Sequence, residues 1–172
     1  MKINISQVRR MTGETARYDL KEEFSPFEFG METISFLSPL HVQLQVHNTG
    51  KLLIAHGTIE AELKAVCGRC LEDFSYPLHL DFEDEWVYAS QATEEQRENA
   101  LIFDKDEIEL RERIMEHIVL ALPMKFVCSP DCQGLCPECG SNLNLGVCSC
   151  SKEMLDPRLA ELTKLAKLTL DD

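Results

Sequence analysis

The sequence predicts an α+β fold, in which an antiparallel β-meander or small barrel-like sheet carries a packed helix and precedes a Cys-rich tail and a C-terminal helix. Residues 39–88 contain three runs of alternating apolar and polar residues, and a period of two is typical of half-buried strands. Apolar residues then recur about every four positions over residues 110–122, as on one face of a helix. Six cysteines follow within residues 128–150.

The three alternating runs predict three neighbouring antiparallel strands. The first, PLHVQLQVH at residues 39–47, ends at the turn residues Asn48-Thr49-Gly50. Its apolar face carries Leu40, Val42, Leu44 and Val46, and its polar face carries His41, Gln43, Gln45 and His47. The second run covers residues 53–65, with Gly57 as an expected bulge, and the third covers residues 74–88. CGRC at residues 67–70 therefore lies in the turn between the second and third strands. Residues 3–8 and 16–20 are weaker strand candidates, and the apolar residues of 24–36 have no clear placement.

The rest of the chain predicts a loop and two helices. Residues 89–106 are polar and rich in Gln and Glu, which favours a mobile, solvated loop. A helix is expected over about 107–122, with Asp106 as its N-cap and Pro123 beyond its end. Asp156-Pro157 predicts the start of a second helix over about 156–168. We expect two units: a β-rich domain at residues 1–125 and a tail at residues 126–172.

The chain is strongly acidic. It has 172 residues, with 17 Lys and Arg against 30 Asp and Glu, which gives a formal net charge of −13. Residues 83–112 alone contain eleven acidic and three basic residues. Because affinity for nucleic acid depends mainly on Lys and Arg at phosphates, the charge argues against a protein that coats bare RNA.

The sequence has no apolar stretch of the kind that directs a protein to secretion or into a membrane. The first ten residues, MKINISQVRR, lack the apolar run of a secretory signal, and no stretch reaches the roughly 18 apolar residues of a membrane span. The expected location is cytoplasmic, with no membrane contact. Since thiols stay reduced there, eight cysteines indicate metal binding rather than disulfides.

The cysteine spacing predicts zinc. Cys136-Pro137-Glu138-Cys139-Gly140 has the form of a zinc knuckle, and Cys148 and Cys150 complete four ligands within fifteen residues. The remaining four, Cys67, Cys70, Cys128 and Cys132, are the right number for a second site. One or two Zn²⁺ ions are therefore expected in a zinc-binding tail tied to the sheet. The sequence does not fix how the eight cysteines divide between sites.

Three other interpretations match parts of the sequence. Cys132, Cys136 and Cys139 also fit the cluster motif of radical enzymes that use S-adenosylmethionine, but this chain is too short for their α/β barrel. A C-x2-C beside a C-x-C resembles redox-responsive zinc chaperones, and that alternative stays open. So does a metal-dependent RNA-processing nuclease that would use carboxylates of residues 83–112, such as Asp104 and Asp106. No catalytic residue is assigned, because the five histidines show no ligand or triad spacing.

Four segments resemble the YceD family, the large ribosomal RNA subunit accumulation proteins. These segments are CGRCL at 67–71, EHIVLALPMK at 116–125, CSPDCQGLCPECGSNLN at 128–144 and DPRLAELTKL at 156–165. The resemblance implies a non-enzymatic role in ribosomal RNA accumulation or processing and in ribosome biogenesis. All eight cysteines match the family's cysteine positions, and the resemblance supplies no catalytic residue.

The expected partner is a basic ribosomal protein or an rRNA-processing enzyme, with the acidic residues 83–112 as the complementary surface. Contact with rRNA is expected to be limited to Arg69, Lys125, Arg9 and Arg10, and no small-molecule substrate is expected.

Overall fold

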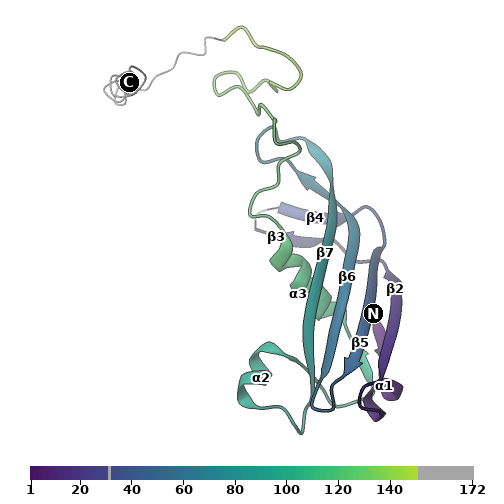
Figure 1. The fold of residues 1–172 in the computed structure, drawn as a ribbon. Coiled ribbons are helices and arrows are strands. Elements are labelled where there is room, and N and C mark those ends of the chain that lie inside the picture. The colour runs from purple at the N-terminus through teal and green to yellow at the C-terminus, as the bar shows by residue number, and fades with distance from the viewer. Residues whose placement is uncertain (31, 151–172) are drawn as a thin grey trace, which may run out of the picture.

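The computed structural model describes residues 1–30 and 32–150, and they form a mixed fold of antiparallel sheets and three helices (Figure 1). In chain order the elements are β1 (Lys2–Asn4), α1 (Ser6–Arg10), β2 (Thr15–Glu22), β3 (Phe27–Phe29), β4 (Glu32–Phe36), β5 (Leu40–Asn48), β6 (Leu53–Val66), β7 (Asp73–Tyr88), α2 (Glu94–Asn99), β8 (Leu101–Phe103), β9 (Glu107–Glu109) and α3 (Arg111–Ala121). The helix expected at 156–168 lies outside the described residues, and the division after residue 125 stays a prediction.

The centre of the fold is an antiparallel meander of β5, β6 and β7, extended by β2 on the outer side of β5. β6 and β7 are the long strands, of 14 and 16 residues, and they pair from Leu53 opposite Trp86 to Val66 opposite Asp73. β8 adds a short parallel strand beside β7, and β4 pairs with the far end of β6. The turn with the CGRC motif thus lies at the tip of the longest hairpin, as the sequence predicts.

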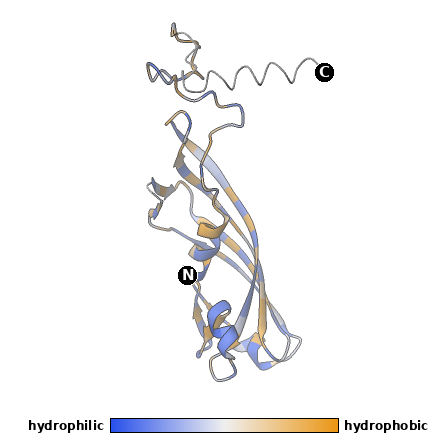
Figure 2. Ribbon diagram, turned by 90° about the vertical axis from the view of Figure 1, so that its left-hand side faces the viewer, coloured by the Kyte–Doolittle hydropathy of each residue, from blue (hydrophilic) through white to orange (hydrophobic). Residues whose placement is uncertain are grey.

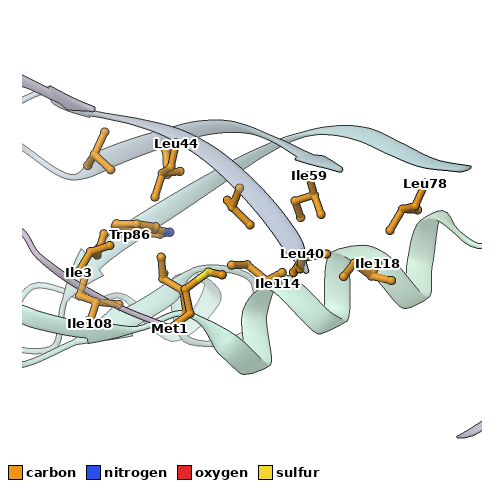
Figure 3. Close-up of a cluster of buried hydrophobic side chains, with 14 of the residues drawn as sticks. Met1, Ile3, Leu40, Leu44, Ile59, Leu78, Trp86, Ile108, Ile114 and Ile118 are labelled. Atoms are coloured by element: carbon orange, nitrogen blue, oxygen red, sulfur yellow. The ribbon is translucent and has the colours of Figure 1, made fainter. Parts of the chain in front are cut away.

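One face of this sheet is buried. Leu44, Ile59 and Trp86 of the sheet and Ile114 and Ile118 of α3 belong to one buried layer (Figure 3). Burying each such side chain contributes about 1.5–3 kcal/mol, so the layer holds α3 across the sheet. The other face is polar, and Figure 2 shows the alternation of apolar and polar residues along the strands.

The polar face carries four of the five histidines, and carboxylates neighbour most of them. His41 lies 3.0 Å from Asp19, and His79 lies 3.1 Å from Glu60. His47 instead contacts the hydroxyl of Thr15 at 2.9 Å. The polar-face positions predicted for His41 and His47 are confirmed, because the residues that alternate with them along β5, Leu40, Val42, Leu44 and Val46, are buried.

Gly57 does not form the expected bulge. It pairs in unbroken register with Leu44 on β5 and Phe82 on β7. A Cβ at this position would lie 2.6 Å from the Phe82 ring and 2.8 Å from the carbonyl oxygen of Gln43. The glycine is therefore required for the close approach of the Phe82 ring, which stacks on His117 of α3 at 4.7 Å.

Residues 89–106 do not form one continuous loop, so the prediction for this segment was wrong. They contain α2 and β8. Thr93 and Gln96 form a capping box that begins α2, and such boxes satisfy two free amides at a helix start. β8 then pairs with the end of β7 through Val87 opposite Ile102. The polar composition gave no sign of α2, because that helix has no buried residue. β8 is only three residues long.

The predicted start of the main helix was also wrong. α3 begins at Arg111, after Leu110, because residues 107–109 instead form β9 and pair with β1, with Ile3 opposite Ile108. Asp106 is no N-cap, since its carboxylate pairs with Arg9 at 2.8 Å. The strand candidate at residues 3–8 likewise ends at Asn4, and α1 follows.

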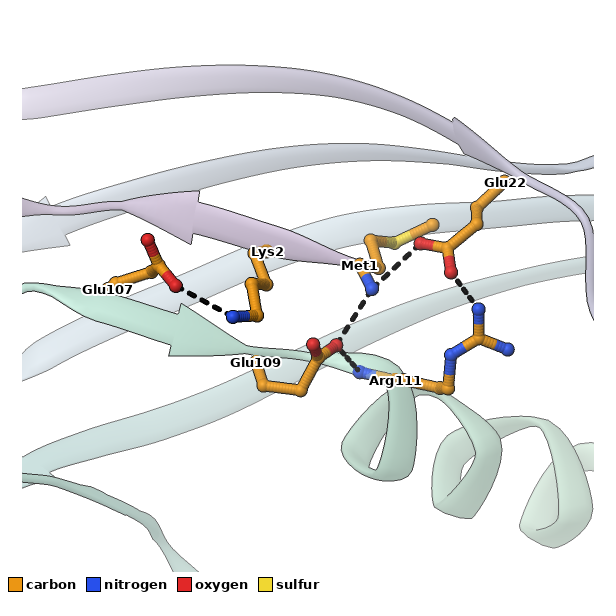
Figure 4. Close-up of polar contacts among 6 residues, drawn as sticks. All are labelled: Met1, Lys2, Glu22, Glu107, Glu109 and Arg111. Carbon is orange, nitrogen blue, oxygen red and sulfur yellow. Dashed lines mark hydrogen bonds and ion pairs between the residues drawn. The ribbon is translucent and has the colours of Figure 1, made fainter.

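Charged groups tie this small β1–β9 sheet to the larger one (Figure 4). The Met1 amine lies 2.7 Å from Glu22 of β2 and 2.7 Å from Glu109 of β9. Glu22 also pairs with Arg111 at the start of α3. The amine beside Glu109 lowers the pKa of that carboxyl. No helix in the described part of the chain is long and apolar enough to cross a membrane.

Candidate metal centres

Eight thiols gather into two groups beyond the tip of the long hairpin. The first cluster consists of Cys67, Cys70, Cys128 and Cys132, and the second consists of Cys136, Cys139, Cys148 and Cys150. Within each group the sulfur atoms lie within 4.8 Å of one another, and all eight cysteines are free thiols. These are the two sets that the spacing of the cysteines suggests.

The first cluster joins distant parts of the chain. Cys67 and Cys70 come from the turn between β6 and β7, whereas Cys128 and Cys132 follow α3. The Cys67 and Cys132 sulfurs are 3.8 Å apart, and the Cys70 and Cys128 sulfurs are 3.7 Å apart. Four metal–sulfur bonds of about 2.3 Å at tetrahedral angles place sulfurs about 3.8 Å apart. These two sulfur–sulfur distances therefore match a tetrahedral thiolate site, and all four sulfurs lie within 4.8 Å of one another.

Both clusters contain the same kind of turn. In the first knuckle, residues 67–71, the Leu71 amide donates to the Cys67 carbonyl at 2.8 Å. In the second knuckle, residues 136–140, the Gly140 amide donates to the Cys136 carbonyl at 2.9 Å. Both Leu71 and Gly140 have positive φ, 61° and 71°. Each turn directs its two thiols to the same side.

Backbone amides surround the sulfur of Cys67. Burial raises the pKa of this thiol, but the amides of Cys128, Cys70 and Arg69 outweigh burial and lower the pKa to about 6. The amides of Arg69 and Cys128 each donate to this sulfur at 3.4 Å. The same cluster raises the pKa of Cys128 to about 12, through burial and the neighbouring thiols. A divalent cation would displace such protons, because thiolates are its ligands.

Cys139 of the second cluster is also acidic. The Ser141 hydroxyl lies 3.1 Å from its sulfur and lowers the pKa of this thiol to about 6, with help from the Ser141 amide. Its neighbour Cys139 raises the pKa of Cys150 to about 12. Unlike Cys67, Cys139 is exposed, so the two acidic thiols differ in their access to solvent.

Arg69 positions the first cluster. Its guanidinium donates to the carbonyls of Pro130 at 3.1 Å and Cys132 at 3.2 Å, and so ties the CGRC turn to the segment that carries the other two thiols. From the sequence, Arg69 was expected to contact RNA. Its role in holding the cluster could not be predicted, because the acceptors are backbone atoms 61 and 63 residues away.

Phe126 leads the chain from the sheet to the first cluster. Its buried ring lies edge-on to Tyr76 at 5.1 Å, and its carbonyl accepts from the Gly68 amide at 2.9 Å. A Cβ on Gly68 would lie 2.6 Å from the side chain of Lys125. The tail is therefore anchored in the core immediately before Cys128.

The acidic residues 83–112 form no comparable cluster. Among the described residues, the groups of three or more possible metal ligands are the two cysteine sets. Asp84 is buried and accepts from Trp86 at 3.1 Å and from Arg113 at 2.9 Å. Burial raises the pKa of Asp84, but His117 and Arg113 outweigh burial and lower the pKa. This carboxylate thus stabilises the fold. Unlike the exposed acidic residues of the segment, it is not part of the surface that the sequence predicts there.

Known proteins resemble this chain over the same region. A family model described as "Large ribosomal RNA subunit accumulation protein YceD" matches residues 55–166, which include all eight cysteines. The chain belongs to the YceD family. This member is 30% identical to the uncharacterized protein Rv2926c of Mycobacterium tuberculosis over 171 residues, 96% of this chain and 81% of that protein.

A second YceD relative comes from a different genus. The uncharacterized protein YlbN of Bacillus subtilis is 26% identical over 168 residues, 97% of each chain. No solved structure matches this chain. The YceD match supports a role related to ribosomal RNA, and the relatives' printed names add no activity.

Proposed function

We propose that this chain is a non-enzymatic, zinc-binding factor of ribosome biogenesis that promotes accumulation or processing of large-subunit rRNA through protein contacts in the cytoplasm. The observation that carries the proposal is the match of the YceD family to residues 55–166, the part of the chain that holds both cysteine clusters. The role in rRNA comes from the family, and the part played by zinc comes from the thiol geometry.

Zinc is the metal that the clusters suit best. Four thiolates in tetrahedral spacing complete its coordination, and a closed set of four protein ligands is typical of structural rather than catalytic zinc. An iron centre can also be held by four thiolates, so metal analysis of protein purified without added metal is decisive. We expect about two zinc ions per chain, and a coloured iron chromophore would contradict this assignment.

The charge favours a basic protein as the partner. Two occupied clusters would add a charge of about −4 to the formal −13. Of the basic residues nominated for RNA contact, Arg69 holds backbone carbonyls and Arg9 pairs with Asp106 and stacks on Tyr88. The exposed carboxylates of α2 instead offer a surface that would speed the approach of a cationic partner.

Affinity capture from cells tests the contact. We expect a partner that is lost at high salt and kept after ribonuclease treatment, because attraction between exposed charges is screened by salt. Replacing Glu94, Glu95 and Glu98 with Gln should release that partner. The matched control replaces three exposed glutamates outside the segment and the clusters, Glu23, Glu28 and Glu62, and should keep it. A partner lost only with ribonuclease would point to RNA instead.

Depletion of the protein tests the role in rRNA. Cells that lack it should accumulate less large-subunit rRNA relative to small-subunit rRNA, and the wild-type chain should restore the ratio. A Cys67→Ser, Cys70→Ser variant should restore it poorly, whereas Ser25→Ala, a change at an exposed residue away from both clusters, should restore it fully. Full restoration by the cysteine variant would remove zinc from the proposal and leave the role in rRNA standing.

A redox-responsive zinc chaperone is the second candidate, and it is favoured by the exposed, acidic Cys139. Thiolate character and exposure make a cysteine susceptible to oxidation. In that case mild peroxide should release zinc and induce suppression of client aggregation. Zinc release without any gain in aggregation suppression would reject this candidate.

A further inference from the structure

The connector between the ligands of the second cluster, residues 140–147, packs on the first cluster. The Leu143 amide donates to the Gly134 carbonyl at 2.9 Å, and Leu135 forms a β-bridge with Asn142. The side-chain nitrogen of Asn142 also donates to the carboxylate of Glu72, immediately before β7, at 3.3 Å. The second cluster is thus built on a loop whose position depends on the first.

Asn144 lies at the centre of this contact. Its side-chain nitrogen donates to the sulfur of Cys132 at 3.4 Å, and its side-chain oxygen accepts from the Gln133 amide at 2.8 Å. Cys132 belongs to the first cluster, whereas Asn144 lies between the second cluster's Cys139 and Cys148. One side chain therefore supports a ligand of one cluster from within the loop of the other.

We propose that the two clusters are coupled in metal binding and that Asn144 is the positioning residue that couples them. This inference rests on the proposed function, since it requires that both clusters bind metal. A hydrogen bond to a ligand sulfur stabilises the thiolate and fixes its direction, and losing such a partner typically costs 10–100-fold in metal affinity. Metal at the second cluster closes the loop and holds Asn144 against Cys132. By linkage, metal at the first cluster favours the second by the same factor.

A double-mutant cycle tests the coupling in the full chain. Zinc affinity at each cluster is measured by competition with a chelator, and the two sites are distinguished by their ¹¹³Cd resonances. Asn144→Ala should weaken the first cluster about tenfold, although it removes no ligand. Removing the second cluster with Cys148→Ser and Cys150→Ser should weaken the first cluster severalfold in the wild-type background and have no effect in the Asn144→Ala background.

Two further variants separate the thiolate contact from folding. Asn144→Asp keeps an oxygen for the Gln133 amide but loses the donor to Cys132, so it should weaken the first cluster at least as much as Asn144→Ala. Asn99→Ala removes a side-chain bond to the Glu95 carbonyl on distant α2, and it should change neither affinity. All variants are checked for an unchanged sheet by circular dichroism.

The outcomes distinguish this inference from the proposed function. If the wild-type chain binds two ions but the cysteine variants weaken the first cluster equally in both backgrounds, the coupling through Asn144 is wrong and the zinc proposal stands. Unchanged affinities in Asn144→Ala lead to the same conclusion. If the wild-type chain binds neither zinc nor cadmium, both are wrong.

Discussion

The two knuckles share one turn but differ in what holds them. The first knuckle, residues 67–71, is closed by two long strands and holds the fully buried Cys67. The second knuckle, residues 136–140, is followed by its remaining ligands within ten residues, and its Cys139 is exposed. The first cluster should therefore depend on the whole fold and retain its metal longer, whereas the second should depend on its metal and on the contacts of its loop with the first cluster.

Loss of one ligand from each cluster should give the largest effects. Cys67→Ser should abolish metal binding at the first cluster and free residues 128–150, because the contacts that hold them converge there, whereas Phe126 should stay in the core. Structural zinc supplies about 10–16 kcal/mol of binding free energy in isolated fingers, so a loss of several kcal/mol is expected. Cys148→Ser should free only the second cluster. Hydrogen exchange measures both, and equal exchange in the two variants would remove the distinction.

Alkylation of the metal-free protein should separate the two acidic thiols by their exposure. Both have a pKa of about 6, so both are mostly thiolate at pH 7, and the thiolate fraction falls about tenfold for each pH unit below 6. Exposed Cys139 should react with iodoacetamide about 10–100-fold faster than an ordinary thiol at pH 7. Buried Cys67 should react slowly at every pH, and rapid reaction there would show that the first knuckle opens without metal. Peptide mapping by mass spectrometry identifies the modified thiol.

Arg69 and Glu138 occupy the same position in the two knuckles and provide a matched pair. Arg69→Ala removes two bonds to carbonyls and should cost about 1–3 kcal/mol, as expected for hydrogen bonds that involve a charged group. Glu138 is exposed, and Glu138→Ala should stay within about 0.5 kcal/mol. Chemical denaturation of the zinc-loaded chain measures both values. A larger loss from Glu138→Ala would reverse the assigned importance of the two turns.

Exchange of the last residue of each knuckle should give the smallest effect. Leu71 holds a positive φ that costs a non-glycine residue about 1–2 kcal/mol, and its side chain is 65% exposed. Leu71→Gly should stabilise the protein by about 0.5–1 kcal/mol after the added chain entropy is counted, whereas Gly140→Ala should destabilise it by about 1 kcal/mol. Thermal melts are sufficient for this comparison. Destabilisation by Leu71→Gly would mean that the leucine makes contacts that strain relief does not replace.

Sequence patterns within short segments correctly predicted the three central strands and suggested the cysteine sets. Alternation over residues 39–88 predicted β5, β6 and β7. The cysteine spacing suggested two sets of four without fixing that division, and the structure groups the thiols in those two sets. The start of α3 was misplaced because Ile108 pairs with Ile3, a contact between segments more than 100 residues apart that overrides helix propensity. The structural roles of Arg69 and Asn144 were not predicted for a similar reason, because their hydrogen-bond partners come close only in the folded chain.

Charge composition misled in one place for a physical reason. The eleven acidic residues of 83–112 suggested a solvent-exposed surface. The side chain of Asp84 is nevertheless buried, on the face of β7 that also carries Phe82 and Trp86. A carboxylate can stay charged there because Arg113 comes within 2.7 Å from α3, and this partner is not visible from the segment itself.

The length of the β6–β7 hairpin has a consequence for assembly. At about 3.3 Å per residue, the 14 residues of β6 span about 45 Å, with the thiol clusters beyond one end and α2 near the other (Figure 1). A separation of this size exceeds the diameter of many small domains. A contact made at α2 and a contact made at the thiol clusters would therefore lie at opposite ends of this hairpin, about 45 Å apart.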